Sequence, residues 1–103
     1  MSSETQLSKS IRSALESIGV WCERIQAGQH RVRGGVLHCA SPGTPDLFCP
    51  ALGLWLEVKT PTGRLEASQE LWFARAEREG VAVVVVRSVA DALDAVRERR
   101  KAS

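Results

Sequence analysis

The sequence predicts an α/β domain in which a mixed β-sheet is flanked by helices. Two observations support this fold class. Three segments have apolar residues at helical spacing, and short alternating or β-branched runs lie between them. A chain of 103 residues offers one core. We therefore assign residues 1–103 to a single domain, with an ordered core over about residues 4–97.

Three helices are expected. The first covers residues 4–18 and is ended by Gly19; its apolar residues share one face. Those residues are Leu7, Ile11, Leu15 and Ile18. The second covers residues 67–79 and is ended by Gly80. Its expected buried positions are Leu71, Trp72 and Ala76. Ser88 caps a third helix from residue 89 to about residue 99.

Strands are predicted between these helices. Residues 20–25 and 36–40 each suggest a short strand, and the glycine-rich, polar stretch 27–35 suggests a loop. The segments 47–49 and 54–59 flank a turn at residues 50–53 and form a predicted β-hairpin. The β-branched run at residues 81–87 predicts a central strand covered on both faces.

Composition excludes several classes of protein. The longest apolar run has six residues, whereas a membrane-spanning helix needs about 20. Three scattered cysteines and a polar N-terminal segment predict an intracellular, reduced protein without structural disulfides. A zinc site would have to use Cys39, Cys49, His30 and His38, whose spacing matches no standard zinc pattern. No role is assigned to the two histidines.

The formal net charge of +2 is too small to identify or exclude a nucleic-acid-binding protein. The basic residues Arg97, Arg99, Arg100 and Lys101 near the C-terminus are typical of a solvated helix end. Arg31 and Arg33 either contact phosphates or only make the loop soluble.

The predicted hairpin brings charged residues together. If its turn is centred between Ala51 and Leu52, Asp46 lies directly opposite Glu57, at about 5 Å between Cβ atoms. Lys59 follows Glu57 on the same face of the strand. Two facing carboxylates repel, and a divalent cation such as Mg²⁺ or Mn²⁺ relieves that repulsion.

Such a cation can bind a phosphate oxygen and lower the pKa of an attacking water. The carbonyl of Val58 is a further candidate ligand, and Lys59 can hydrogen-bond the water or offset charge on the phosphate. These groups suit phosphodiester hydrolysis. Two simpler interpretations stay open: Asp46 after Pro45 is typical of a turn, and Glu57 with Lys59 is typical of a solvated strand edge.

Several motifs in order resemble one known family. They are Gly43-Thr44-Pro45-Asp46, Glu57-Val58-Lys59, Gln69 to Trp72, Gly63, Glu4 in the first helix and the Arg24 to Gly28 stretch. Together they resemble the PD-(D/E)XK nuclease superfamily, and within it the VRR-NUC (virus-type replication-repair nuclease) domain. The resemblance covers nearly the whole chain.

The resemblance implies a restriction-endonuclease-like αβββαβ core and a Mg²⁺- or Mn²⁺-dependent endodeoxyribonuclease. It implies that Asp46 and Glu57 bind metal, that Lys59 assists the water, and that Glu4 reaches the site from the first helix. Gln69 would lie near the metal or the DNA backbone. Stand-alone members of this branch are similar to Holliday-junction resolvases, which implies branched or four-way DNA, a homodimer, and the cytoplasm of a bacterial or phage-infected cell.

Some roles and functions remain alternatives. Glu4 also suits a first helical turn simply as an acid, and Gln69 also suits a helix surface. Trp55 and Trp72 are expected to pack rather than to stack on DNA bases. The leading function is a structure-selective endonuclease. The alternatives are a catalytically silent module that binds branched DNA or a partner protein, and a regulatory or structural domain in which the charged trio is incidental.

Overall fold

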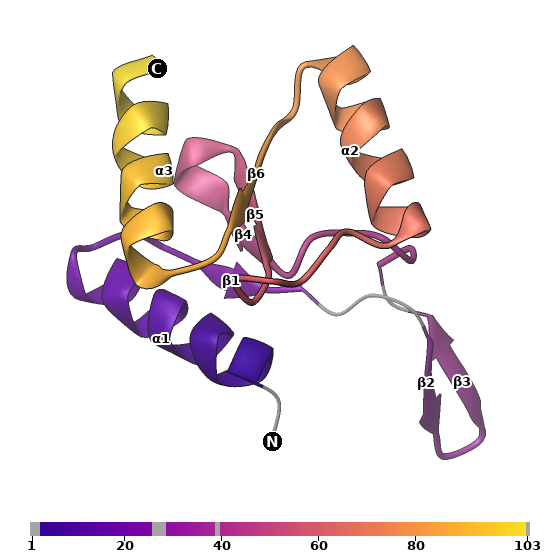
Figure 1. Cartoon of the computed structure of the whole chain (residues 1–103). Helices are drawn as coiled ribbons and strands as arrows, with labels where there is room; N and C mark the ends of the chain where they lie inside the picture. The colour runs from indigo at the N-terminus through magenta and orange to yellow at the C-terminus, as the bar shows by residue number, and fades with distance from the viewer. Residues whose placement is uncertain (1–2, 26–28, 39, 103) are drawn as a thin grey trace.

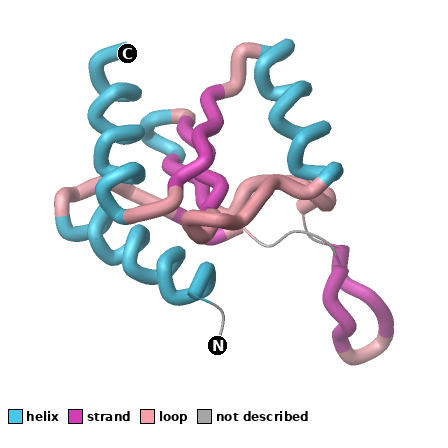
Figure 2. The backbone as a smooth tube through the Cα atoms, in the orientation of Figure 1, coloured by secondary structure: helices cyan, strands magenta, loops and turns pink. Residues whose placement is uncertain are grey.

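A computed structural model describes residues 3–25, 29–38 and 40–102, with main chain only at 29–32 and 35–38. A four-stranded sheet in the order β1-β4-β5-β6 lies between α1 and α3 on one side and α2 on the other (Figure 1). The two-stranded β2-β3 ribbon extends away from this body (Figure 2). The elements are α1 (Ser3–Ser17), β1 (Glu23–Arg24), β2 (Gln29–Val32), β3 (Gly35–His38), β4 (Leu47–Cys49), η1 (Pro50–Leu52), β5 (Leu54–Val58), α2 (Ala67–Glu79), β6 (Ala82–Val86) and α3 (Val89–Ala102).

The central hairpin has the predicted register. Leu47 pairs with Leu56 and Cys49 with Leu54, so paired positions sum to 103. The turn between the strands is the short 3₁₀ helix η1, closed by Gly53 in the left-handed region at φ +58°. Glycine adopts that conformation without a Cβ clash, which explains the sharp return of the chain.

One face of the sheet forms the hydrophobic core. The residues of β4 and β5 that point to this face pack with the apolar stripes of α1 and α3. They include Leu47, Cys49, Leu54, Leu56 and Val58 from the strands, Ile11 and Leu15 from α1, and Ala92 and Val96 from α3. Their alternation along β5 follows from the two-residue repeat of a strand.

The opposite face carries aromatic residues under α2. The ring of Trp55 lies 4.4 Å from that of Phe48 and 5.3 Å from that of Trp72, measured between centroids. The last contact is edge-to-face, a favourable geometry for aromatic pairs. Trp55 and Trp72 therefore pack against each other, as expected.

Two predicted helix ends, the C-terminus of α2 at Gly80 and the Ser88 cap of α3, are confirmed, whereas α3 extends to Ala102. Gly80 ends α2 at φ +72°, and the Ser88 hydroxyl accepts a hydrogen bond from the Asp91 N–H at 3.0 Å. None of the helices in the described part of the chain is long and apolar enough to span a membrane.

Four expectations are corrected. The stretch 27–35 is not simply a loop, because residues 29–32 form β2 and pair with β3; residues 26–28 lie outside the described chain. The strand expected at residues 20–25 is reduced to Glu23–Arg24. Leu71 is 73% exposed, because the side of α2 on which it lies faces away from the sheet.

The last correction concerns β6. The strand forms as predicted and pairs in parallel with β5, but it is the outer strand of the four-stranded sheet and not a central one. An apolar run of β-branched residues looks the same in sequence at both positions. Its place depends on which strands are available as neighbours.

Candidate active site

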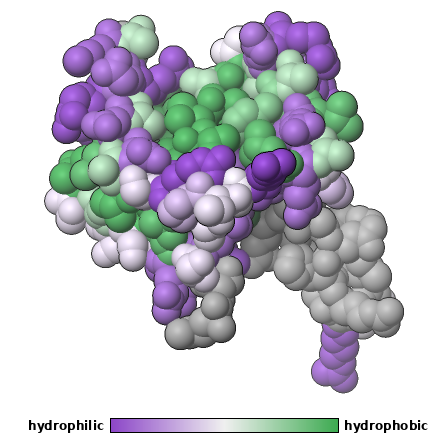
Figure 3. All heavy atoms as spheres, viewed as in Figure 1, coloured by the Kyte–Doolittle hydropathy of each residue, from purple (hydrophilic) through white to green (hydrophobic). Residues whose placement is uncertain are grey.

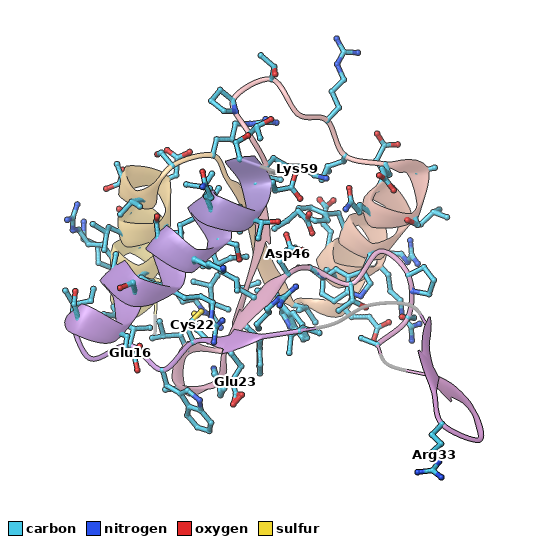
Figure 4. The ribbon with its side chains drawn as sticks, turned by 90° about the horizontal axis from the view of Figure 1, so that it is seen from below. Glu16, Cys22, Glu23, Arg33, Asp46 and Lys59 are labelled. Atoms are coloured by element: carbon cyan, nitrogen blue, oxygen red, sulfur yellow. The ribbon has the colours of Figure 1, made fainter. Side chains whose placement is uncertain are left out.

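Asp46 and Glu57 meet where the β4-β5 hairpin opens. Asp46 directly precedes β4, and continuation of the observed register places it opposite Glu57. The Val58 N–H donates a hydrogen bond of 3.0 Å to Asp46 Oδ2, which fixes this carboxylate across the hairpin. In Figure 4 Asp46 lies between α1 and α2. The two carboxylates therefore meet as the hairpin register predicts.

A third carboxylate comes from the first helix. Glu4, Asp46 and Glu57 each offer an oxygen, and these atoms all lie within 4.8 Å of one another. Glu4 lies in the first turn of α1, more than forty residues from Asp46 in sequence. The packing of α1 against α3 and β5 brings it to the end of the hairpin.

Lys59 and Gln69 both contact Glu57. The Lys59 ammonium nitrogen lies 3.6 Å from Glu57 Oε2, and Gln69 Nε2 donates a 3.2 Å hydrogen bond to the same oxygen. Glu57 is 1% exposed and Lys59 is 6% exposed. Buried charges at this level need partners, and this pair is therefore not a solvated strand edge.

The electrostatics of Glu57 favour an added cation. Burial, and then the negative charge of Asp46, raise the pKa of Glu57 to about 8, against the opposing effect of Lys59. Its second oxygen, Oε1, is buried and has no hydrogen-bond partner among the residues that the structure describes. A divalent cation would stabilise the charged form and give Oε1 a ligand contact.

The donor atoms also fit Mg²⁺ or Mn²⁺, which prefer oxygen ligands. The main-chain groups of Val58 face the β4 side, because its N–H bonds Asp46 there and N–H and C=O of one strand residue point the same way. The Val58 carbonyl is thus directed toward the carboxylates. Glu4, Asp46, Glu57 and this carbonyl are the groups that could hold the ion.

Two local features position these groups. Gly43 has φ +92° and packs so closely on α2 that a Cβ would collide with the Ser68 carbonyl. This turn delivers the buried Pro45 and then Asp46 to the hairpin. Gln69 Oε1 accepts a 2.8 Å hydrogen bond from the Glu66 N–H, so one side chain caps α2 and contacts Glu57.

Sequence reasoning missed the role of Arg87. Its guanidinium donates hydrogen bonds of 2.7 Å to the Thr60 carbonyl and 2.6 Å to the Gly63 carbonyl. The Lys59 N–H also donates to the Val86 carbonyl at 3.0 Å. The loop after Lys59 is therefore fastened to the end of β6. An arginine at a strand end gives no local signal of this long-range contact.

Among the described residues, Cys49 and the basic residues near the C-terminus lie away from the site. The side chains of His30, His38 and Cys39 lie outside the described residues, and Cys49 is buried in the core. Near the C-terminus, Arg97 and Lys101 form ion pairs along their own helix with Asp94 and Glu98. These pairs fit the expected solvated helix end, whereas Arg99 Nε donates to the Leu52 carbonyl at 2.8 Å.

Comparison with known proteins identifies the family. The family model described as the VRR-NUC domain matches residues 2–90. Neither the curated proteins nor the solved structures include a match. The matched segment contains Glu4, Asp46, Glu57, Lys59 and Gln69. The chain therefore belongs to the VRR-NUC family of nuclease domains.

Proposed function

We propose that this protein is a Mg²⁺- or Mn²⁺-dependent endonuclease that hydrolyses phosphodiester bonds in branched DNA, with four-way junctions as the leading substrate. The observation that carries this proposal is the convergence of Glu4, Asp46 and Glu57 within 4.8 Å, beside a buried lysine. A bound divalent ion would neutralise a phosphate oxygen and lower the pKa of water.

The side chains of the site have separate tasks in this proposal. Asp46 and Glu57 hold the ion from the two facing segments of the hairpin, and Glu4 from α1 is the third carboxylate ligand. Lys59, whose ammonium lies 3.6 Å from Glu57, orients the attacking water or offsets charge on the phosphate. Gln69 holds Glu57 Oε2 in place through its 3.2 Å hydrogen bond.

The direct test is cleavage of a substrate panel. Labelled linear duplex, flap and four-way junction DNA are incubated with the protein in Mg²⁺, Mn²⁺ or EDTA. We expect cutting of the junction in either metal and none in EDTA. Junction binding in Ca²⁺ without cutting in Mg²⁺ or Mn²⁺ would favour the silent binding module. Equal cutting of all three substrates would remove the proposed selectivity for branches.

We infer that two copies act together and that they pair through the outer edge of β6. The edge lacks a neighbouring strand within the described chain, and its Val84 is 38% exposed. Hollows of 630 and 570 Å³ flank the strand toward α3 and α2. Figure 3 shows the apolar surface between these two helices. Such an uncovered apolar edge favours pairing with another strand.

A second copy is the occupant that this edge fits. The Val86 carbonyl faces β5, so the main-chain groups of Val83 and Val85 face outward. In an antiparallel pair with its two-fold axis at Val84, Val83 of one copy bonds with Val85 of the other. Because every residue of this strand is apolar, the strand can pair with the same strand of a second copy. A symmetric pair also suits a four-way junction, which needs two symmetric cuts.

Size-exclusion chromatography with light scattering tests pairing through the edge of β6. We expect the protein to have twice the 11.2 kDa mass of one chain. Val84→Lys should give monomers, because it places two like charges at the axis. Leu71→Lys is the control, since it alters an equally apolar but more exposed position on α2. A Val84→Lys protein that stays dimeric would exclude this edge.

A further inference from the structure

We propose that Arg12, Lys9 and Arg24 form a phosphate-binding pocket beside the carboxylate cluster, which takes a DNA backbone phosphate next to the one that is cut. This inference rests on the proposed nuclease function and names a substrate contact of the same site. The pocket has a volume of 110 Å³, and Glu4 and Asp46 form its border with the carboxylate cluster. It is thus continuous with the proposed metal site.

The pocket combines charges from two elements. Lys9 and Arg12 come from successive turns of α1, and Arg24 comes from β1. Within the described chain, none of these three cations forms an ion pair with a carboxylate. They remain available to an anionic ligand. Only the rim toward the carboxylates carries negative charge, which a bound divalent ion would offset.

Arg12 provides the second observation. Its Nε is buried and lacks a hydrogen-bond partner among the described residues. Leaving a buried donor unsatisfied is costly, and such groups in native proteins usually have a partner. A phosphate oxygen supplies that partner, because a guanidinium presents several donors in a geometry that matches phosphate. Arg12 is therefore assigned as a substrate-binding residue and Arg24 as its helper.

The test measures binding apart from chemistry. Fluorescence anisotropy of labelled junction DNA in Ca²⁺ gives Kd as a function of salt. We expect Arg12→Ala to raise Kd about tenfold and to lower the salt slope by about one, as expected for one lost phosphate contact. Arg12→Lys should recover the slope but only part of the affinity. Arg97→Ala, on the solvated side of α3, is the matched control.

Activity separates this inference from the proposed function. In Mg²⁺ we expect Arg12→Ala to raise KM by a similar factor and to leave kcat within about twofold. Unchanged Kd and salt slope in both Arg12→Ala and Arg24→Gln would overturn the pocket, even if the protein cuts DNA. Loss of affinity in a protein that never cuts would retain the pocket and remove the nuclease proposal. If inorganic phosphate at micromolar concentration saturably displaced the labelled DNA, the ligand of the pocket would be a free anion. That result would also overturn the assignment of the pocket to a DNA phosphate.

A different observation points to a disulfide-forming pair in Cys22 and Cys49. The β1-β4 register pairs Glu23 with Phe48, so its continuation sets Cys22 directly opposite Cys49. The Ile25 N–H bonds the Asp46 carbonyl, which makes the cysteine pair one of the close, non-hydrogen-bonded pairs of the ladder. Cα atoms in such pairs are about 4.5 Å apart, within the range of disulfides.

The two thiols differ in reactivity. A hydrogen bond with Cys49, and then the charge of Arg12, lower the pKa of Cys22, whereas the same hydrogen bond and burial raise the pKa of Cys49. Cys22 is partly exposed and Cys49 is buried. With hydrogen peroxide as oxidant, the Cys22 thiolate attacks one peroxide oxygen, the O–O bond breaks, and a sulfenic acid forms while hydroxide leaves. The Cys49 sulfur then attacks the Cys22 sulfur, forming the disulfide and releasing water.

Peptide mass mapping after hydrogen peroxide treatment tests this pair. We expect a Cys22–Cys49 crosslink in the natural chain and in Cys39→Ser, the matched control. Cys49→Ser should instead retain an oxidised Cys22 that dimedone captures. The bond should raise Tm by at least about 5 °C, because it closes a loop of more than 20 residues. A crosslink to Cys39, or no crosslink, would overturn the assignment.

Discussion

The two faces of the β4-β5 hairpin have opposite chemistry although they alternate along the same few residues. Toward α1 and α3, Leu47, Leu56 and Val58 are fully buried in an apolar core. Toward α2, Glu57 is also buried but is surrounded by charged and polar groups. Glu57 is thus as deeply buried as these core residues, and what differs is the chemistry of its partners.

This difference separates the stability of the domain from its chemistry. Burial of apolar area on the core side stabilises the hairpin. On the other side, burial and the nearby Asp46 oppose the charged form of Glu57, as its raised pKa shows. The core face therefore supplies the free energy that holds mutually repelling carboxylates together. Substitutions on the two faces should give different phenotypes.

The largest effect on activity is expected at Asp46. Asp46→Asn keeps an oxygen that can accept the Val58 hydrogen bond but removes the charge that holds a cation. A bound ion contributes several kcal/mol, so cleavage should fall about 10³-fold or more. Single-turnover cleavage measures this, with the melting temperature taken in parallel. Asp94→Asn, on exposed α3, is the control. Full cutting by Asp46→Asn would remove Asp46 from the mechanism.

The largest effect on stability is expected on the core face. Leu56→Ala removes a fully buried side chain and should lower the free energy of unfolding by about 2–5 kcal/mol. Urea denaturation measures the loss, and cleavage at low temperature should survive in the folded fraction. A Leu56→Ala protein that is stable but inactive would contradict the separation of the two faces.

Metal binding at the carboxylate cluster should also stabilise the fold, by an amount that depends on the metal concentration. Mg²⁺ or Mn²⁺ at 100 times its Kd should stabilise the domain by about 2.7 kcal/mol, because it binds only the folded cluster. Calorimetry should show this rise in Tm, and Asp46→Asn should abolish it. EDTA should remove activity without unfolding the protein. Collapse of the fold in EDTA would instead indicate a structural metal.

The last test concerns the turn that positions Asp46. Gly43→Ala forces an alanine into the left-handed region, which costs about 1–2 kcal/mol, and also collides with the Ser68 carbonyl. Gly19→Ala is a matched control, because it has φ +80° and open space around its Cβ. We expect Gly43→Ala to lose more stability than Gly19→Ala. We expect cleavage to be lost in Gly43→Ala and kept in Gly19→Ala. Equal losses at both positions would show that the contact with α2 is unimportant.

The sequence by itself determined the local parts of this structure. The helical spacing in α1, the glycine ends of α1 and α2, and the turn at residues 50–53 predicted the elements and the hairpin register. The register in turn predicted that Asp46 faces Glu57. These features depend on residues close in sequence, where periodicity and turn conformation are decisive.

Only the tertiary structure decided the remainder. It placed Glu4 beside Asp46, fastened Arg87 to the loop after Lys59, and left β6 at the edge of the sheet. These contacts join segments more than twenty residues apart, and their geometry depends on how whole helices pack on the sheet. The local sequence pattern determines which residues share one face of a helix or strand. Only tertiary packing determines which other elements contact that face.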